Sequence, residues 1–74
     1  MENQHRKIKG YRELTQEEVN LMNTSKELAA AVGSLIEVLE KTEDIDQRWL
    51  AVSKTDLQKG FMSLVRSIAR PTTF

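Results

Sequence analysis

The stretch Thr15-Gln16-Glu17-Glu18, followed by VNLMNTSKELAAAVGSLIEVLE over residues 19–40, decides the fold of this 74-residue chain. Its first four residues match a capping box, in which the Thr15 hydroxyl accepts from the Glu18 amide and the Glu18 carboxylate accepts from the Thr15 amide. The apolar residues that follow recur every three or four positions, the spacing of an amphipathic helix. The sequence therefore predicts a helix over residues 15–41.

A second helix follows after a short bend at Thr42-Glu43. Asp44 is a candidate N-cap, apolar residues again recur at helical spacing, and Pro71 stops the helix. We therefore expect a helix over residues 44–70, antiparallel to the first. The predicted fold is a single all-α domain, residues 1–74. It is an antiparallel two-helix hairpin whose residues 1–14 form a flexible arm or a short helix.

Each predicted helix carries more apolar surface than one partner helix can cover. The stripes expected to pack on each other are Leu14, Glu18, Leu21, Ser25, Leu28, Val32, Leu35 and Leu39, and Leu50, Lys54, Leu57, Phe61, Leu64 and Ile68. Off these stripes lie Met22, Ala29, Ala30, Ile36, Val38, Trp49, Val52, Met62 and Val65. A small domain without disulfides or metal needs another source of stability. We expect homo-oligomerisation, with any function located between subunits.

Charge is balanced overall, with 11 basic and 11 acidic residues, but it is unevenly distributed. Basic residues predominate in residues 1–12 and 47–74, whereas acidic residues predominate in 13–46. A hairpin brings the two basic regions together at its open end, which makes that end a candidate anion site. The neutral total gives no general attraction to DNA or to a membrane.

Several classes of function find no support in the residues. There is no cysteine, the single histidine is His5, and no nucleotide-binding or metal-ligand motif occurs. We therefore expect no enzyme activity, no cofactor and no metal. Without an 18-residue apolar run or an apolar N-terminal stretch, we expect a cytoplasmic protein.

Lys26 is the one charge on the helical line Val19, Met22, Lys26, Ala29, Gly33, Ile36. Its aliphatic stem could simply cover apolar surface while the ammonium reaches water or a glutamate. Alternatively, the ammonium is held among small residues to meet an anion. Gly33 and Gly60 permit a close helix crossing, or Gly60 leaves room for a ligand.

Tyr11 lies beside Lys9 and Arg12, just before the capping box. The ring could pack on a neighbouring subunit, or it could stack on a nucleobase while the cations meet phosphate. Fifteen residues separate Tyr11 from Lys26, about 22 Å if all are helical. That exceeds the span of a small dinucleotide. Unless the arm folds back, one pocket would take these two residues from different chains.

Arg66 and Arg70 stand four residues apart near the end of the second helix. Cations in a last helical turn complement the helix dipole, which is a sufficient structural reason for them. Their functional interpretation is a second anion site, strengthened if several copies converge on a symmetry axis.

A family resemblance rests on three groups of residues. These are IKGYREL over residues 8–14 with Asn23 and Lys26, RWLAV over 48–52, and LQKGFM over 57–62 with VRSIARP over 65–71. The pattern, over about residues 8–71, resembles the hairpin domain of the second class of phage anti-CBASS sponge proteins. A related anti-Thoeris sponge shares this domain.

The resemblance implies an all-helical homohexamer that sequesters cyclic oligonucleotide second messengers without cleaving them, in the cytoplasm of an infected bacterium. Cyclic dinucleotides would lie between pairs of protomers, with a tyrosine on a base and a lysine on phosphate. Tyr11 and Lys26 fit these roles. Arg66 and Arg70 are the candidates for a separate cyclic trinucleotide pocket. Two alternatives remain, an assembly module without a small-molecule ligand and nucleic-acid binding through the basic arm.

Overall fold

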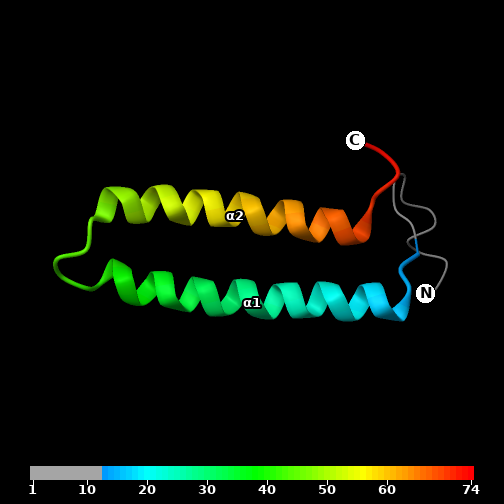
Figure 1. Ribbon diagram of the computed structural model, residues 1–74, viewed down its shortest axis with the longest axis horizontal. Helices are drawn as coiled ribbons and strands as arrows, with labels where there is room; N and C mark the ends of the chain where they lie inside the picture. Colours follow the sequence, from blue (N-terminus) through cyan, green and yellow to red (C-terminus); the bar gives the residue numbers. More distant parts are fainter. Residues whose placement is uncertain (1–12) are drawn as a thin grey trace.

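The chain forms two long antiparallel helices that lie side by side (Figure 1). A computed structural model describes residues 13–74, in which α1 spans Gln16–Glu40 and α2 spans Gln47–Ala69. No strand occurs in this part of the chain. The predicted all-α antiparallel hairpin is confirmed. No helix among these residues has the length and apolar character needed to cross a membrane.

The start of α1 is the predicted capping box. The Glu18 amide donates to the Thr15 hydroxyl at 3.1 Å, and the Thr15 amide donates to the Glu18 Oε1 atom at 2.9 Å. Two amides that the first helical turn would otherwise leave without a partner are thereby satisfied. The local sequence alone fixes this helix boundary.

The bend places the start of α2 later than residue 44. Asp44 has a φ of 66°, in the left-handed region, so it belongs to the turn rather than to the helix. The capping residue is Asp46, whose carboxylate accepts from the amides of Arg48 and Trp49. The expected cap at Asp44 is therefore wrong by two residues, because the geometry of the turn places Asp46 at the start of the helix.

The side of α1 that faces α2 differs from the expected stripe. The buried and half-buried residues of α1 are Glu18, Val19, Met22, Ser25, Ala29, Val32, Ile36 and Leu39. Leu21, Leu28 and Leu35, which the sequence pattern places in the contact, are instead 49%, 55% and 57% exposed. Two stripes with the same alternating spacing share some members. The stripe that faces α2 contains Ala29, whereas the expected stripe contains the larger Leu28.

The same applies to α2, where only part of the expected stripe lies in the contact. Leu50 is buried, and Phe61 and Ile68 are half-buried, as predicted. Leu57 and Leu64 are more exposed, at 38% and 43%. Half-buried Val65, expected off the stripe, partly takes the place of Leu64.

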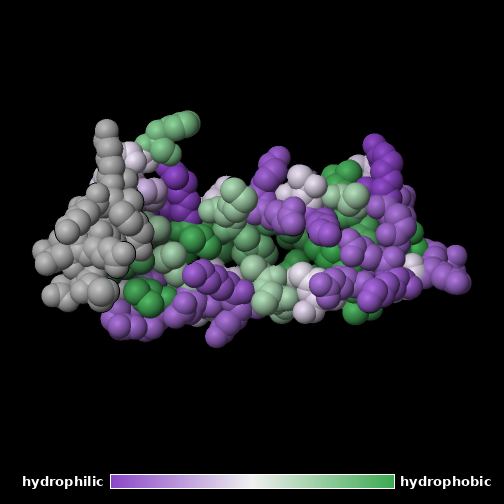
Figure 2. Space-filling view, turned by 180° about the vertical axis from the view of Figure 1, so that it is seen from behind, coloured by the Kyte–Doolittle hydropathy of each residue, from purple (hydrophilic) through white to green (hydrophobic). Residues whose placement is uncertain are grey.

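The core between the helices is thin. Among residues 13–74, only Ser25, Ile36 and Leu50 are buried. The Ser25 hydroxyl donates to the Leu21 carbonyl at 3.0 Å, so its burial leaves no hydrogen bond unmade. Figure 2 shows apolar side chains gathered along the line where the helices meet, with hydrophilic side chains at the rims. A large share of the apolar surface therefore remains exposed.

An ion pair closes the open end of the hairpin. The Arg70 Nη2 atom donates to the Glu18 Oε2 atom at 3.0 Å, while the other Glu18 oxygen belongs to the capping box. One carboxylate thus joins the start of α1 to the end of α2. Near the bend, the Lys54 ammonium pairs with Glu40 at 3.1 Å.

We predict that Glu18→Ala lowers the free energy of unfolding by about 1–2 kcal/mol, because it removes both the capping contact and the ion pair. Glu18→Gln should lower it less, since an amide oxygen can still accept from the Thr15 amide. Glu17→Ala is the matched control, because Glu17 also lies in the first turn but carries no such contact. Denaturant unfolding followed by circular dichroism measures the difference. Equal effects at positions 17 and 18 would contradict the double role of Glu18.

Candidate functional site

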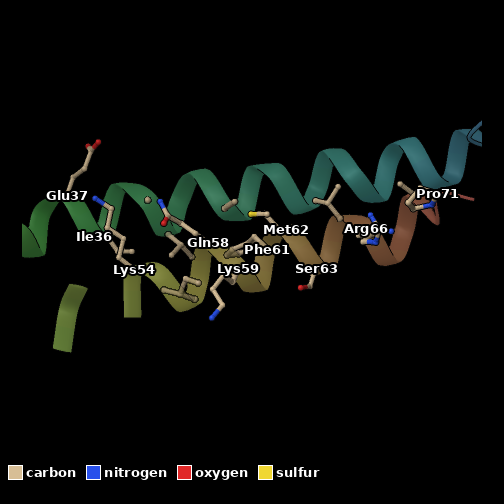
Figure 3. A pocket seen from close by; sticks show the side chains of 16 residues that line it. Ile36, Glu37, Lys54, Gln58, Lys59, Phe61, Met62, Ser63, Arg66 and Pro71 are labelled. Atoms are coloured by element: carbon tan, nitrogen blue, oxygen red, sulfur yellow. The ribbon is translucent and has the colours of Figure 1, made fainter. Parts of the chain in front are cut away.

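An open groove runs along one flank of the line where the helices meet (Figure 3). Ala29, Val32, Gly33 and Ile36 line it from α1, and Phe61, Met62, Val65 and Ala69 are among its residues from α2. Glu37 and Lys54 lie at the bend end, and Arg66 and Pro71 lie at the other end. The groove therefore has an apolar floor with charged groups at both ends.

Met62 and Gly33 leave the groove open. Met62 is 71% exposed, and an added Cβ at Gly33 would meet nothing within 4 Å. An added Cβ at Gly60 would also meet nothing within 4 Å. A close crossing of α1 and α2 at the glycines, one of the two interpretations of the sequence, therefore does not occur within the hairpin.

Lys26 lies on the same flank of α1 as the groove. It precedes Gly33 by seven residues, two helical turns, so both residues occupy one face of the helix. The side chain is exposed, and its ammonium makes no hydrogen bond or ion pair with any residue in 13–74. A positive charge is thus presented to solvent beside an apolar surface.

The opposite flank carries a second apolar surface, which we term the leucine face: Leu21, Leu28, Leu35 and Leu64. The three α1 leucines are spaced by seven residues and therefore lie above one another. Leu64 and Met62 are two residues apart, about 200° around α2, so they point to opposite sides. The hairpin consequently exposes apolar side chains on both of its broad faces.

Arg66 and Arg70 lie at the open end, but each contacts a different part of the chain. Arg70 binds Glu18 through the ion pair described above. The Arg66 Nη2 atom donates to the main-chain oxygens of Thr73 and Phe74, at 3.1 and 2.9 Å. The structure therefore places the two guanidiniums near one end of α2 without joining them in one cluster.

The remaining predicted site residues, Lys9, Tyr11 and Arg12, lie outside the described residues, so their roles stay predictions. No group of three or more potential metal ligands occurs in the part of the chain that the structure describes.

Two features of this surface were not found from the sequence. The groove was missed because its position depends on which stripe of α1 faces α2. The Arg66 contact was missed because its acceptors are main-chain oxygens, which no side-chain pattern reveals. A positive φ at Arg70, followed by Pro71, produces the turn that brings them close.

Comparison with known proteins agrees with this architecture. The family model of the Acb2/Tad1 hairpin domain matches residues 3–69. The chain is also 37% identical, over 105 aligned positions, to Anti-CBASS protein 2 of Pseudomonas phage JBD67. That alignment covers 96% of this chain and 97% of the relative. The resemblance carried by residues 8–71 is confirmed, and the chain belongs to the Acb2/Tad1 hairpin family.

Proposed function

We propose that this protein counters CBASS defence by binding cyclic oligonucleotide messengers and holding them without cleavage. Its family supports this function, because the relative from phage JBD67, which it matches over nearly its whole length, is an anti-CBASS protein. Sequestration requires affinity and many sites, and it requires no general base, nucleophile or metal.

The observation that carries the proposal to a particular site is the position of Lys26. A lysine ammonium with no partner in residues 13–74, beside an apolar groove, has the two properties that a phosphate and an adjoining base require. The ammonium supplies a compact positive charge, and the apolar side chains exclude water from the contact. Lys26 is the proposed phosphate ligand.

Tyr11 is the proposed base-stacking residue, with Lys9 and Arg12 beside it as further phosphate contacts. Each stacked base contributes about 1–3 kcal/mol in single-stranded nucleic-acid complexes. A cyclic dinucleotide has two bases and two phosphates. A two-fold related pair of Tyr11 and Lys26 residues therefore matches its symmetry.

Self-association supplies such a pair, and the two exposed faces favour it. A dimer formed through one face would leave the other face in water. Association through both the leucine face and the groove side would cover both, and two interfaces of different symmetry close into an assembly larger than a dimer. A homohexamer, which the family resemblance implies, satisfies this requirement.

Arg66 and Arg70 are the proposed ligands of a second anion site, for cyclic trinucleotides. Arg66 lines the end of the groove, and its guanidinium can bind a phosphate through two parallel hydrogen bonds. Arg70 would contribute mainly by its positive field, because it already binds Glu18.

Lys26→Ala and Tyr11→Ala are each expected to weaken cyclic dinucleotide binding at least ~10-fold, a loss of about 1.4 kcal/mol or more. Isothermal titration calorimetry with 3′,3′-cyclic dinucleotides measures the effect. Lys41→Ala is the control, because Lys41 is an exposed lysine at the far end of α1. Unchanged affinity in both variants would remove these two assignments. Loss of the oligomer in both, with or without nucleotide, would instead favour the assembly module.

Leu28→Glu is expected to reduce the mass of the assembly, because it places a charge at the centre of the leucine face. Ser34→Glu introduces the same charge at an exposed position of α1 away from that face. Analytical ultracentrifugation of both variants and the parent chain separates the effects. A parent chain that is a folded monomer at micromolar concentration would contradict the proposed assembly.

Ligand released from the protein is expected to be chemically intact. The protein is incubated with cyclic di- and trinucleotides, unfolded by heat, and the supernatant is analysed by chromatography against untreated ligand. Recovery of linear or monomeric products, absent from a heated ligand control, would identify an enzyme and refute sequestration.

A further inference from the structure

The residues after α2, 70–74, turn back over the end of the helix. Arg70 adopts a left-handed conformation with a φ of 46°, Pro71 cannot continue the helix, and Figure 1 shows the tail returning above α2. This path brings the oxygens of Thr73 and Phe74 to the Arg66 side chain, seven and eight residues back along the chain. We call residues 71–74 the strap.

The strap binds the Nη2 atom of Arg66, the nitrogen that both kinds of bidentate contact require. A guanidinium binds an oxyanion bidentately through either Nη1 with Nη2 or Nε with Nη2, and both pairs include Nη2. Nη2 carries two hydrogens, and both acceptors of the strap bind to this atom, at 3.1 and 2.9 Å. While the strap is in place, Arg66 cannot offer either bidentate pair in full.

The strap also lies where an anion would approach. Pro71 and Arg66 both line the same end of the groove, as Figure 3 shows. In the 74-residue chain the Thr73 acceptor is a neutral carbonyl oxygen, whereas the Phe74 acceptor is an oxygen of the terminal carboxylate. A phosphate oxygen also forms a charge-assisted bond and therefore competes with both. A phosphate can therefore displace the strap, but part of its binding free energy is spent in doing so.

We propose that residues 71–74 act as a competitive latch on Arg66, so that a phosphodiester and the strap alternate on its guanidinium. This inference deepens the proposed second anion site and rests on Arg66 being a phosphate ligand. The latch holds Arg66 in a defined position when the site is empty. It also raises the anion concentration needed to occupy the site, because the strap must be displaced first. Arg70 is not part of the exchange, because its ion pair with Glu18 points to the other helix.

Competition is tested by titrating the ¹⁵N-labelled full chain with inorganic pyrophosphate and following the Arg66 Nε–Hε resonance by NMR. The same titration is run on a chain ending at Thr72 and on a chain extended by Gly-Ser after Phe74. We expect the shortened chain to reach its midpoint at a pyrophosphate concentration about three- to tenfold lower, since exposed hydrogen bonds contribute less than buried ones. The extended chain retains both oxygens but converts the Phe74 carboxylate into a neutral carbonyl, so its midpoint should lie between those of the parent and the shortened chain.

A double-mutant cycle separates the latch from a general effect of the chain end. In an Arg66→Lys background, shortening should give no gain, because lysine lacks the bidentate donor pairs. Helix content by circular dichroism checks that every variant is folded, and full-length Pro71→Gly provides a second way of loosening the strap.

Equal midpoints in the parent and shortened chains would overturn the latch. An equal lowering of the midpoint on shortening in the Arg66→Lys background would overturn it too. So would an Arg66 chemical shift that does not change on addition of pyrophosphate in any of the chains. Cyclic dinucleotide binding at Lys26 is measured independently. Its failure would remove the proposed function at Lys26. Equal midpoints in the Arg66 titration would remove only the latch, whereas an Arg66 resonance unaffected by pyrophosphate would also remove the second anion site.

Discussion

A single line of contact between two helices is the constraint on which the rest of this structure depends. Each helix can turn only one side toward its neighbour, so a hairpin can bury only one stripe from each. Here that stripe is poor in large side chains on α1, where Ser25 and Ala29 occupy its middle. The hairpin closes along these small residues, and the leucines remain outside. The apolar surface left uncovered in this way is available for contacts between subunits.

Polar contacts at the two ends compensate for the thin centre. Thr15, Glu18 and Arg70 connect the start of α1 with the end of α2, while Asp46 caps α2 and Glu40 binds Lys54 near the bend. Of these contacts, the Glu18–Arg70 and Glu40–Lys54 ion pairs join the two helices, and both favour the antiparallel register. The same closure holds Arg70 on Glu18, which leaves Arg66 as the guanidinium exposed toward the groove and the strap. The ion pair that joins the two helices therefore also leaves Arg66, rather than Arg70, as the arginine proposed to bind an anion.

The proposed function follows from how few tasks the surface has to perform. Sequestration of a cyclic oligonucleotide needs cations for its phosphates, an aromatic surface for its bases and shelter from water. One hairpin offers these as separate fragments: Lys26 beside an open apolar groove, Arg66 at its end, and Tyr11 in the preceding arm. Symmetric association would bring fragments of different copies together, so that one short sequence supplies several sites. The thin core and the proposed shared pocket would thus both follow from the same geometry.

Elements with a local cause are encoded by residues that lie close together in the chain. The capping box at Thr15 and Glu18, the antiparallel helices and the family membership could be predicted, because each depends on residues close in sequence or on a pattern of residue types. Lys26 could also be selected as a candidate site residue, because it interrupts an otherwise uncharged helical line.

Only the tertiary structure decided which apolar stripe of α1 faces α2, which aspartate caps α2, and what Arg66 contacts. Stripes based on Leu28 and on Ala29 have the same spacing, so periodicity cannot choose between them; the choice depends on how closely two backbones approach. The Arg66 contacts are to main-chain oxygens, whose positions follow from the backbone angles of Arg70 and Pro71 rather than from side-chain identity. Contacts between residues close in sequence can be inferred from their order, whereas packing and main-chain contacts depend on how the folded chain is arranged.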